Sequence, residues 1–190
     1  MAIKTFTTGE VLTAADTNTY LANSGLVYVT QASATSGTLI SISNCFTSTY
    51  RNYRIFVNCT VGTSGSMQMR YQTAGSADVA SSYRWARFYG NADNTAQGQA
   101  GQVSGTENTM GQLNANIPQG FIYDVFNPQE PLVTGTSLQP YIESTASLGT
   151  LYLGFSASSK DTTSQYDGIV HYFPGTISAA TVTIFGYRKA

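Results

Sequence analysis

The chain has 190 residues and a mass of 20.3 kDa, which is the size of one domain with enough material to bury a hydrophobic core. Only 10% of its residues are charged, against about 25% in an average soluble protein, and the formal net charge of -1 comes without a basic cluster. This pattern excludes the electrostatic attraction on which nucleic-acid binding depends, so we expect no nucleic-acid partner.

The sequence contains no run of the roughly 18 to 20 apolar residues that a membrane span needs, and no basic and apolar N-terminal leader. We therefore expect no membrane insertion and synthesis in a cytosol. A surface rich in Ser, Thr, Gly and Asn but poor in charge is solvated weakly, which favours self-association.

The first element in chain order is a short helix near the N-terminus. Thr13 is followed three residues later by Asp16, which is the spacing of a capping box. We expect a helix from about Ala14 to Ala22, ended by Gly25. Because a helix this short is marginal in water, its apolar residues need a partner surface, which can be another chain. We predict that residues 1–25 form an anchor segment outside the main body.

The same segment carries a family resemblance. From Phe6 onward, FTTGEVLTAADTNTYL is similar to the N-terminal F-T-x-G-E-V-L-T-A-A-D-x-N-x-Y-L motif of a family of small bacteriophage virion proteins, in which the motif precedes a β-sandwich body. Two strands of the body add to the likeness, YRNYRIFVN from Tyr50 and the closing TVTIFGYRKA. The resemblance implies a structural or adsorption role, as a tail, fibre-like or minor structural protein, and it supplies no catalytic residues. The anchor residues that we expect to contact other virion proteins are Phe6, Val11, Leu12, Asp16, Tyr20 and Leu21.

From Leu26 the pattern changes to short runs of alternating residues, separated by Gly, Ser, Asn and Pro at a spacing of roughly 10 to 15 residues. The clearest run is Asn52 to Thr60, whose alternate apolar residues share one face, as a half-buried strand requires. The predicted strands are Leu26 to Val29, Thr38 to Ile42, Asn52 to Thr60, Met67 to Tyr71, Tyr83 to Tyr89, Phe121 to Phe126, Leu138 to Ile142, Thr150 to Phe155, Gly168 to Phe173 and Thr181 to Tyr187.

Two local features follow from these strands. We expect hairpins between the first two runs and between the third and fourth, because short turn sequences join them. The stretch from Gly90 to Asn116 has too few apolar residues for a buried strand, and we interpret it as a long loop. Such a loop can contact a receptor, lock neighbouring subunits together or simply remain on the surface.

One strand combines large aromatic residues with arginine. Tyr83, Trp85, Arg87 and Tyr89 alternate along it, and aromatic rings beside guanidinium groups are typical of both sugar recognition and protein interfaces. Large aromatic residues are more often buried, so filling of the core is the plainer interpretation. Either face of this strand can point inward. We expect this set to form either a ligand or subunit contact or part of the core.

The sequence provides little for catalysis or metal binding. His171 is the only histidine, which removes most nucleophile and base pairs and most zinc sites, and we interpret it as a structural residue. The acids are scattered, and a glycosidase would need a pair such as Glu130 and Glu143 to meet across a cleft. We expect no cofactor and no metal. Cys45 and Cys59 are interpreted as free, buried thiols, because thiols stay reduced in a cytosol.

The sequence thus predicts an all-β, antiparallel, jelly-roll-like β-sandwich over residues 26–190, preceded by the short helix. The expected function is that of a non-enzymatic virion structural protein assembled in the host cytoplasm. We expect a homotrimeric tail or fibre-like appendage involved in host attachment, with a cell-surface glycan or protein as its outer partner. A capsid decoration protein is the alternative within this class. A virion carbohydrate-active enzyme or a carbohydrate-binding module is the alternative from another class.

Overall fold

The computed structural model describes residues 7–11, 13, 25–91, 97–144 and 151–188. These residues form thirteen strands and no helix. The helix expected from Ala14 to Ala22 lies outside the described residues. The strands are β1 (Leu26–Ala34), β2 (Leu39–Ile42), β3 (Tyr50–Val61), β4 (Gly65–Thr73), β5 (Ser76–Ala77), β6 (Tyr83–Asn91), β7 (Gln97–Gly105), β8 (Asn108–Leu113), β9 (Gln119–Phe126), β10 (Thr134–Ser144), β11 (Leu151–Lys160), β12 (Gly168–Tyr172) and β13 (Ile177–Arg188).

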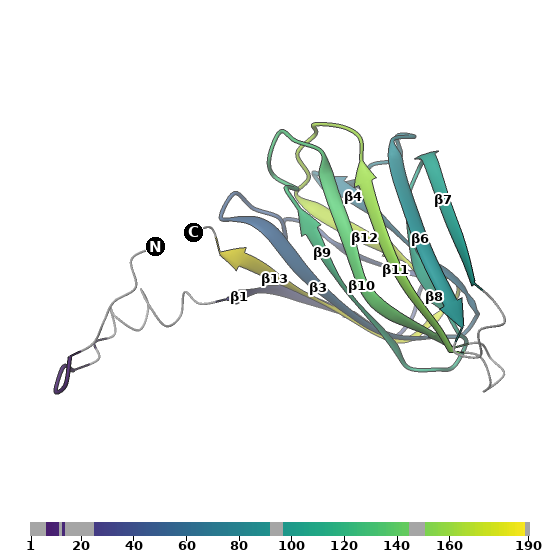
Figure 1. Cartoon of the computed structure of the whole chain (residues 1–190), viewed down its shortest axis with the longest axis horizontal. Coiled ribbons are helices and arrows are strands. Elements are labelled where there is room, and N and C mark those ends of the chain that lie inside the picture. The colour runs from purple at the N-terminus through teal and green to yellow at the C-terminus, as the bar shows by residue number, and fades with distance from the viewer. Residues whose placement is uncertain (1–6, 12, 14–24, 92–96, 145–150, 189–190) are drawn as a thin grey trace.

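The strands form two antiparallel sheets (Figure 1). The eight-stranded sheet has the order β1-β13-β3-β9-β10-β11-β6-β7. The five-stranded sheet has the order β2-β12-β4-β5, with β8 also paired to β4. Each of the ten predicted strands overlaps one of the observed strands, so the all-β class predicted from the alternating pattern is confirmed.

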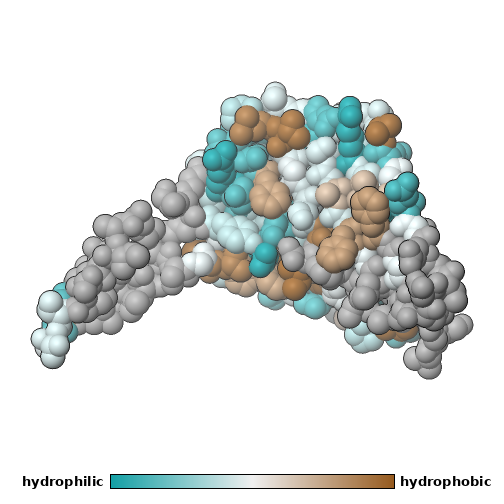
Figure 2. Space-filling model, in the orientation of Figure 1, coloured by the Kyte–Doolittle hydropathy of each residue, from teal (hydrophilic) through white to brown (hydrophobic). Residues whose placement is uncertain are grey.

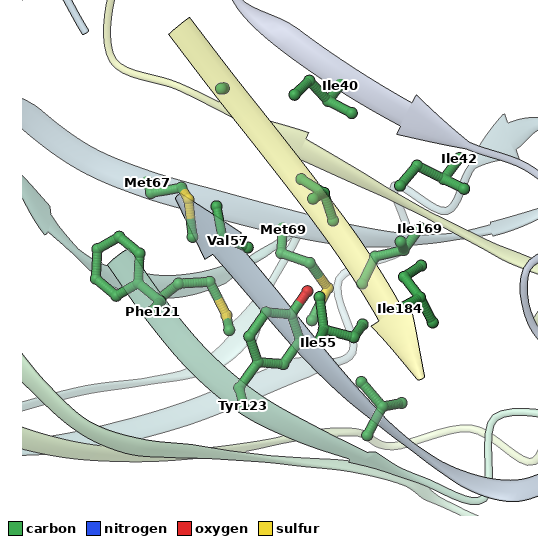
Figure 3. Packing of buried hydrophobic residues seen from close by; sticks show 14 of the residues in the cluster. Ile40, Ile42, Ile55, Val57, Met67, Met69, Phe121, Tyr123, Ile169 and Ile184 are labelled. Carbon is green, nitrogen blue, oxygen red and sulfur yellow. The ribbon is translucent and has the colours of Figure 1, made fainter. Parts of the chain in front are cut away.

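The core lies between the two sheets, where alternate residues of facing strands meet. On β3, Tyr53, Ile55 and Val57 are at most 1% exposed. They pack with Met67 and Met69 of β4 in one continuous hydrophobic cluster (Figure 3). Because successive residues of a strand point to opposite faces, this burial fixes which face of each sheet is the inner one.

Both predicted hairpins are wrong. β1 pairs with β13 and β2 with β12, so the first two strands lie in different sheets. β3 and β4 are likewise in different sheets, and the intervening turn carries the chain across the core. The Gly62 amide donates to the Thr176 carbonyl at 2.8 Å, which fixes the start of this crossing against the loop before β13. A short Gly and Ser turn is compatible with a hairpin or with a crossing, and burial of both inner faces favours the crossing.

The loop predicted from Gly90 to Asn116 is also wrong, because it contains β7 and β8. β7 forms a ladder with β6 and lies at the end of the eight-stranded sheet. An edge strand with an exposed outer face needs no apolar alternation, since its stability comes from the hydrogen-bonded ladder and from its neighbour. The residues QGQAGQVSG therefore gave no strand signal.

Candidate interaction face

The aromatic and arginine strand β6 divides its residues between the two faces of the sheet. Tyr83 is fully buried, which places Tyr83, Trp85 and Arg87 on the inner face. The alternate residues, among them Ala86 and Phe88, are exposed on the outer face. The eight-stranded sheet lies toward the viewer in Figure 1, so Figure 2 shows this outer face, with apolar side chains spread among polar ones.

Tyr83 is a core residue with a hydrogen-bonding role. Its hydroxyl accepts a hydrogen bond from the Tyr71 amide at 3.0 Å and donates one to the Asp78 carbonyl at 3.1 Å. Burial raises the pKa of Tyr83, so the group stays neutral. The Tyr83 side chain ties β6 to β4 and to the loop after β5, and it is closed to a ligand outside the fold.

Trp85 and Arg87 lie side by side and are half-buried. The Trp85 indole donates to Gln102 Oε1 of β7 at 3.2 Å, and the Arg87 guanidinium lies 5.9 Å from the centre of the indole ring. The structure thus brings Trp85 and Arg87 together as predicted. The side chain of Tyr89 lies outside the described side chains.

The N-terminal motif is described only in part. Val11 is 78% exposed, whereas Phe6, Leu12, Asp16, Tyr20 and Leu21 lie outside the described residues. Thr7 to Glu10 form a tight turn in which the Glu10 amide donates to the Thr7 carbonyl at 3.0 Å and the Thr7 amide donates to the Glu10 carboxylate at 3.1 Å. Gly9 has a φ of 89°, a conformation that favours glycine. The turn is therefore held by its own residues and presents Val11 to solvent.

The outer face of the eight-stranded sheet carries exposed apolar residues that the sequence interpretation missed. Phe155 of β11 and Phe88 of β6 are direct partners across the two strands, and they are 58% and 62% exposed. Val103 of β7 is 70% exposed. We call Phe155, Phe88 and Val103 the apolar patch. A sequence signal existed in the alternation of β6, but the sequence left open which of its two faces points outward.

Within the apolar patch, a row of small residues lies between the Phe88 and Phe155 pair and Val103. Ser137, Ala157, Ala86 and Gly101 are register partners across β10, β11, β6 and β7. A recess of about 400 Å³ opens where Ala86 and Ala157 lie between larger neighbours. Arg84 at its rim forms an ion pair with Asp161. The result is a shallow trough with an apolar ridge along one side.

A polar cluster occupies the same face nearer its centre. The Arg54 guanidinium donates to both carboxylate oxygens of Asp124 at 2.8 Å, and the Tyr187 hydroxyl donates to Asp124 at 2.7 Å. Burial, with the adjacent carboxylate, raises the pKa of Tyr187 to about 12. Because the two charges neutralise each other, the cluster joins β3, β9 and β13 without giving the face a net charge.

A buried lysine lies at the end of β11. Lys160 is 0% exposed, and its Nζ lies 2.9 Å from the Ala80 carbonyl, 3.2 Å from Asp78 Oδ1 and 4.0 Å from the centre of the Tyr83 ring. Burial lowers the pKa of Lys160. Burial alone would raise the pKa of Asp78, but hydrogen bonds from the Ala80 amide, Lys160 and Tyr166 outweigh it and lower that pKa. Through these contacts Lys160 connects the end of β11 to the loop after β5.

The single histidine is also structural. His171 is fully buried, its Nε2 lies 2.5 Å from the Tyr123 hydroxyl, and burial lowers its pKa to about 3. The neutral ring and the Tyr123 hydroxyl share a hydrogen bond that links the two sheets through the core. His171 is a structural residue, as interpreted from the sequence, and the structure adds that it forms a hydrogen bond between the two sheets.

Cys45 and Cys59 are both buried and free, which confirms the prediction for the thiols. Burial raises their pKa values to about 12 and about 11. Within the described residues, no group of three or more His, Cys, Asp or Glu side chains lies close enough to hold a metal ion. In the same part of the chain, no helix is long and apolar enough to cross a membrane. The Glu143 side chain, the possible partner of Glu130, lies outside the described side chains.

Among the described residues, the outer face of the eight-stranded sheet is therefore a broad exposed surface that carries both the apolar patch and the trough. Comparison with known proteins adds no family to this description, because no protein-family model, curated protein or solved structure matches the chain.

Proposed function

We propose that the chain is a non-enzymatic structural protein of a bacteriophage virion. In this proposal it is a homotrimeric tail or fibre-like appendage that takes part in host attachment. The N-terminal segment holds it in the particle, and the β-sandwich forms the exposed body. The observation that carries the proposal is the N-terminal motif, FTTGEVLTAADTNTYL, placed directly before an antiparallel β-sandwich.

Strand order supports a jelly roll as the body of this protein. Eight strands fall into two groups, β1-β13-β3-β9 in one sheet and β2-β12-β4-β8 in the other. Each group places strands from the beginning and the end of the chain side by side, which is how two Greek keys wind into a jelly roll. In this assignment, β5 to β7 are an insertion between β4 and β8, and β10 and β11 are an insertion between β9 and β12. Jelly rolls are frequent in viral capsid and lectin domains.

Several properties of the body favour a structural role over an enzymatic one. Two of its buried ionisable groups, Lys160 and His171, are occupied by contacts that join elements of the fold. Its outer face has an exposed apolar patch, and the chain carries few charges to keep copies apart. Closed symmetry would bury such a face, which is the support for the homotrimer.

The described part of the N-terminal motif supports the anchor role. Thr7 to Glu10 are held as a turn by their own hydrogen bonds, and Val11 beside the turn is exposed. A segment ordered in advance loses less conformational entropy when it binds a partner.

Removal of residues 1–25 tests the proposal. The truncated chain, beginning at Leu26, should fold, keep the far-ultraviolet circular dichroism of a β protein and fail to enter particles in a complementation experiment. A matched variant, Val11→Ser, should fold as well and enter particles less efficiently. If the truncated chain enters particles as well as the full chain, the anchor role is wrong; if it fails to fold, the segment belongs to the body.

A further inference from the structure

The apolar patch lies on the strands that extend the eight-stranded sheet beyond its central part. β11, β6 and β7 follow β10 at one end of the strand order. Phe155, Phe88 and Val103 are more than half exposed although each stands in a regular ladder. Exposed apolar residues gathered on one face of a small protein commonly mark a site of protein contact.

The apolar patch contains a ridge and a trough of complementary shape. Phe155 and Phe88 are opposite each other across β11 and β6 and form a ridge. The next row on the same face is the trough of Ser137, Ala157, Ala86 and Gly101. Because these residues are small, another side chain can approach the backbone of the sheet closely at this point.

We infer that this face is the contact between copies of the chain, in which the Phe155 and Phe88 ridge of one copy packs into the trough of a neighbouring copy. The inference rests on the proposed homo-oligomer and names the surface that forms it. Ridge and trough are neighbouring rows of one face, so each copy supplies both halves of the contact, which makes the surface self-complementary.

The charges of this face are compatible with a second copy. Arg84 and Asp161 at the rim of the trough form an ion pair within one chain, as Arg54 and Asp124 do nearer the centre of the face. Two such faces therefore meet without repulsion between like charges. β7, which includes Val103, is the edge strand of the sheet and contains no charged residue and no proline. Natural edge strands use charged residues and proline to prevent pairing with other chains.

The chemistry of the ridge favours protein over glycan. A phenylalanine ring has no hydrogen-bonding group, whereas sugar recognition needs donors and acceptors aimed at hydroxyl groups beside an aromatic surface. The Trp85 indole on this part of the sheet donates to Gln102 on the inner side. The trough floor is built of alanine and glycine at Ala157, Ala86 and Gly101, which suits the burial of another apolar side chain.

The first test is sedimentation velocity of the full chain and the double variant Phe88→Ser with Phe155→Ser. Both side chains point outward, so the variant should keep the circular dichroism of the wild type. The dissociation constant of the oligomer should rise by at least about 30-fold, as expected when central aromatic residues of an interface are removed. The matched control, Leu39→Ser with Val79→Ser, removes side chains that are 46% and 61% exposed away from the eight-stranded sheet, and it should leave the oligomer unchanged.

The second test does not depend on the stability of the double variant. Phe88→Cys and Ala157→Cys chains, co-expressed and oxidised, should form a disulfide between copies, because the ridge of one meets the trough of the other. The natural thiols Cys45 and Cys59 are buried and stay out of this reaction. Phe88→Cys with Val79→Cys is the control and should remain uncross-linked, because Val79 lies in the loop after β5.

The outcomes separate this inference from the proposed function. An oligomer that survives in the double variant, with no cross-link between Phe88→Cys and Ala157→Cys, overturns the inference and leaves the proposed oligomer in place. A wild-type chain that is a monomer at micromolar concentration overturns the homo-oligomer itself. Dissociation of the double variant together with the specific cross-link supports both.

Discussion

Acid should destabilise this protein through its single histidine. His171 is fully buried, and its Nε2 shares a hydrogen bond with the Tyr123 hydroxyl. Burial lowers its pKa from 6.5 to about 3 in the folded state. Between these two values the unfolded chain binds a proton that the folded chain does not, so the free energy of unfolding falls as the pH falls.

The magnitude follows from this shift. The stability contribution of the neutral ring is fully present above pH 6.5 and is lost as the pH falls from 6.5 toward 3, by up to about 1.4 kcal/mol for each pH unit. From pH 7 to pH 5 we expect a loss of about 2 kcal/mol from His171. Most carboxylates remain ionised over this range, so the histidine should dominate the change.

Urea unfolding at pH 7, 6 and 5, at one protein concentration, measures this loss in the wild type and in His171→Gln. The glutamine variant should be less stable at pH 7, because it repacks the core, but its stability should change little with pH. The reasoning is refuted if the wild type and the variant show the same dependence on pH between 7 and 5.

Three further predictions concern the core and the ion pair of Lys160. Cys45→Ala with Cys59→Ala should keep the fold and lose about 1 to 3 kcal/mol of stability, since each change leaves only a small cavity; a reductant that produces the same loss in the wild type would instead indicate a disulfide. Gly186→Ala should destabilise the protein by about 1 to 3 kcal/mol in thermal unfolding, because a Cβ at this position collides with the Tyr50 ring, and an unchanged midpoint would contradict this packing. Lys160→Met should be tolerated better than Asp78→Asn, because Met removes the buried charge and Asn leaves it without its carboxylate; equal losses by urea unfolding would argue against the ion pair.

The strands of the core could be predicted from the sequence because burial leaves a period of two. β3 shows this most clearly, since Tyr53, Ile55, Val57 and Cys59 are all buried and alternate with residues that are more exposed. β7 left no such trace, because an edge strand with small residues needs only its ladder to β6. The two sheets could not be separated from sequence, since the turn after β3 suits a hairpin and a crossing equally well.

Only some residues of the candidate interaction face could be predicted from the sequence. The set of Tyr83, Trp85 and Arg87 was recognised, but its orientation depended on which face of β6 meets the core. The partner of Phe88 is Phe155, far along the chain on β11, and only the register of the two strands brings the rings together. Long-range pairing of this kind leaves no mark in the local residue pattern.

The measurement that tests the central proposal most directly is the copy number of the chain in purified phage particles, determined by quantitative mass spectrometry after a high-salt wash. A structural protein anchored by its N-terminal segment should remain bound at a constant number of copies per particle, and that number should be a multiple of three. A chain found in the infected-cell lysate but absent from the washed particles would contradict the account.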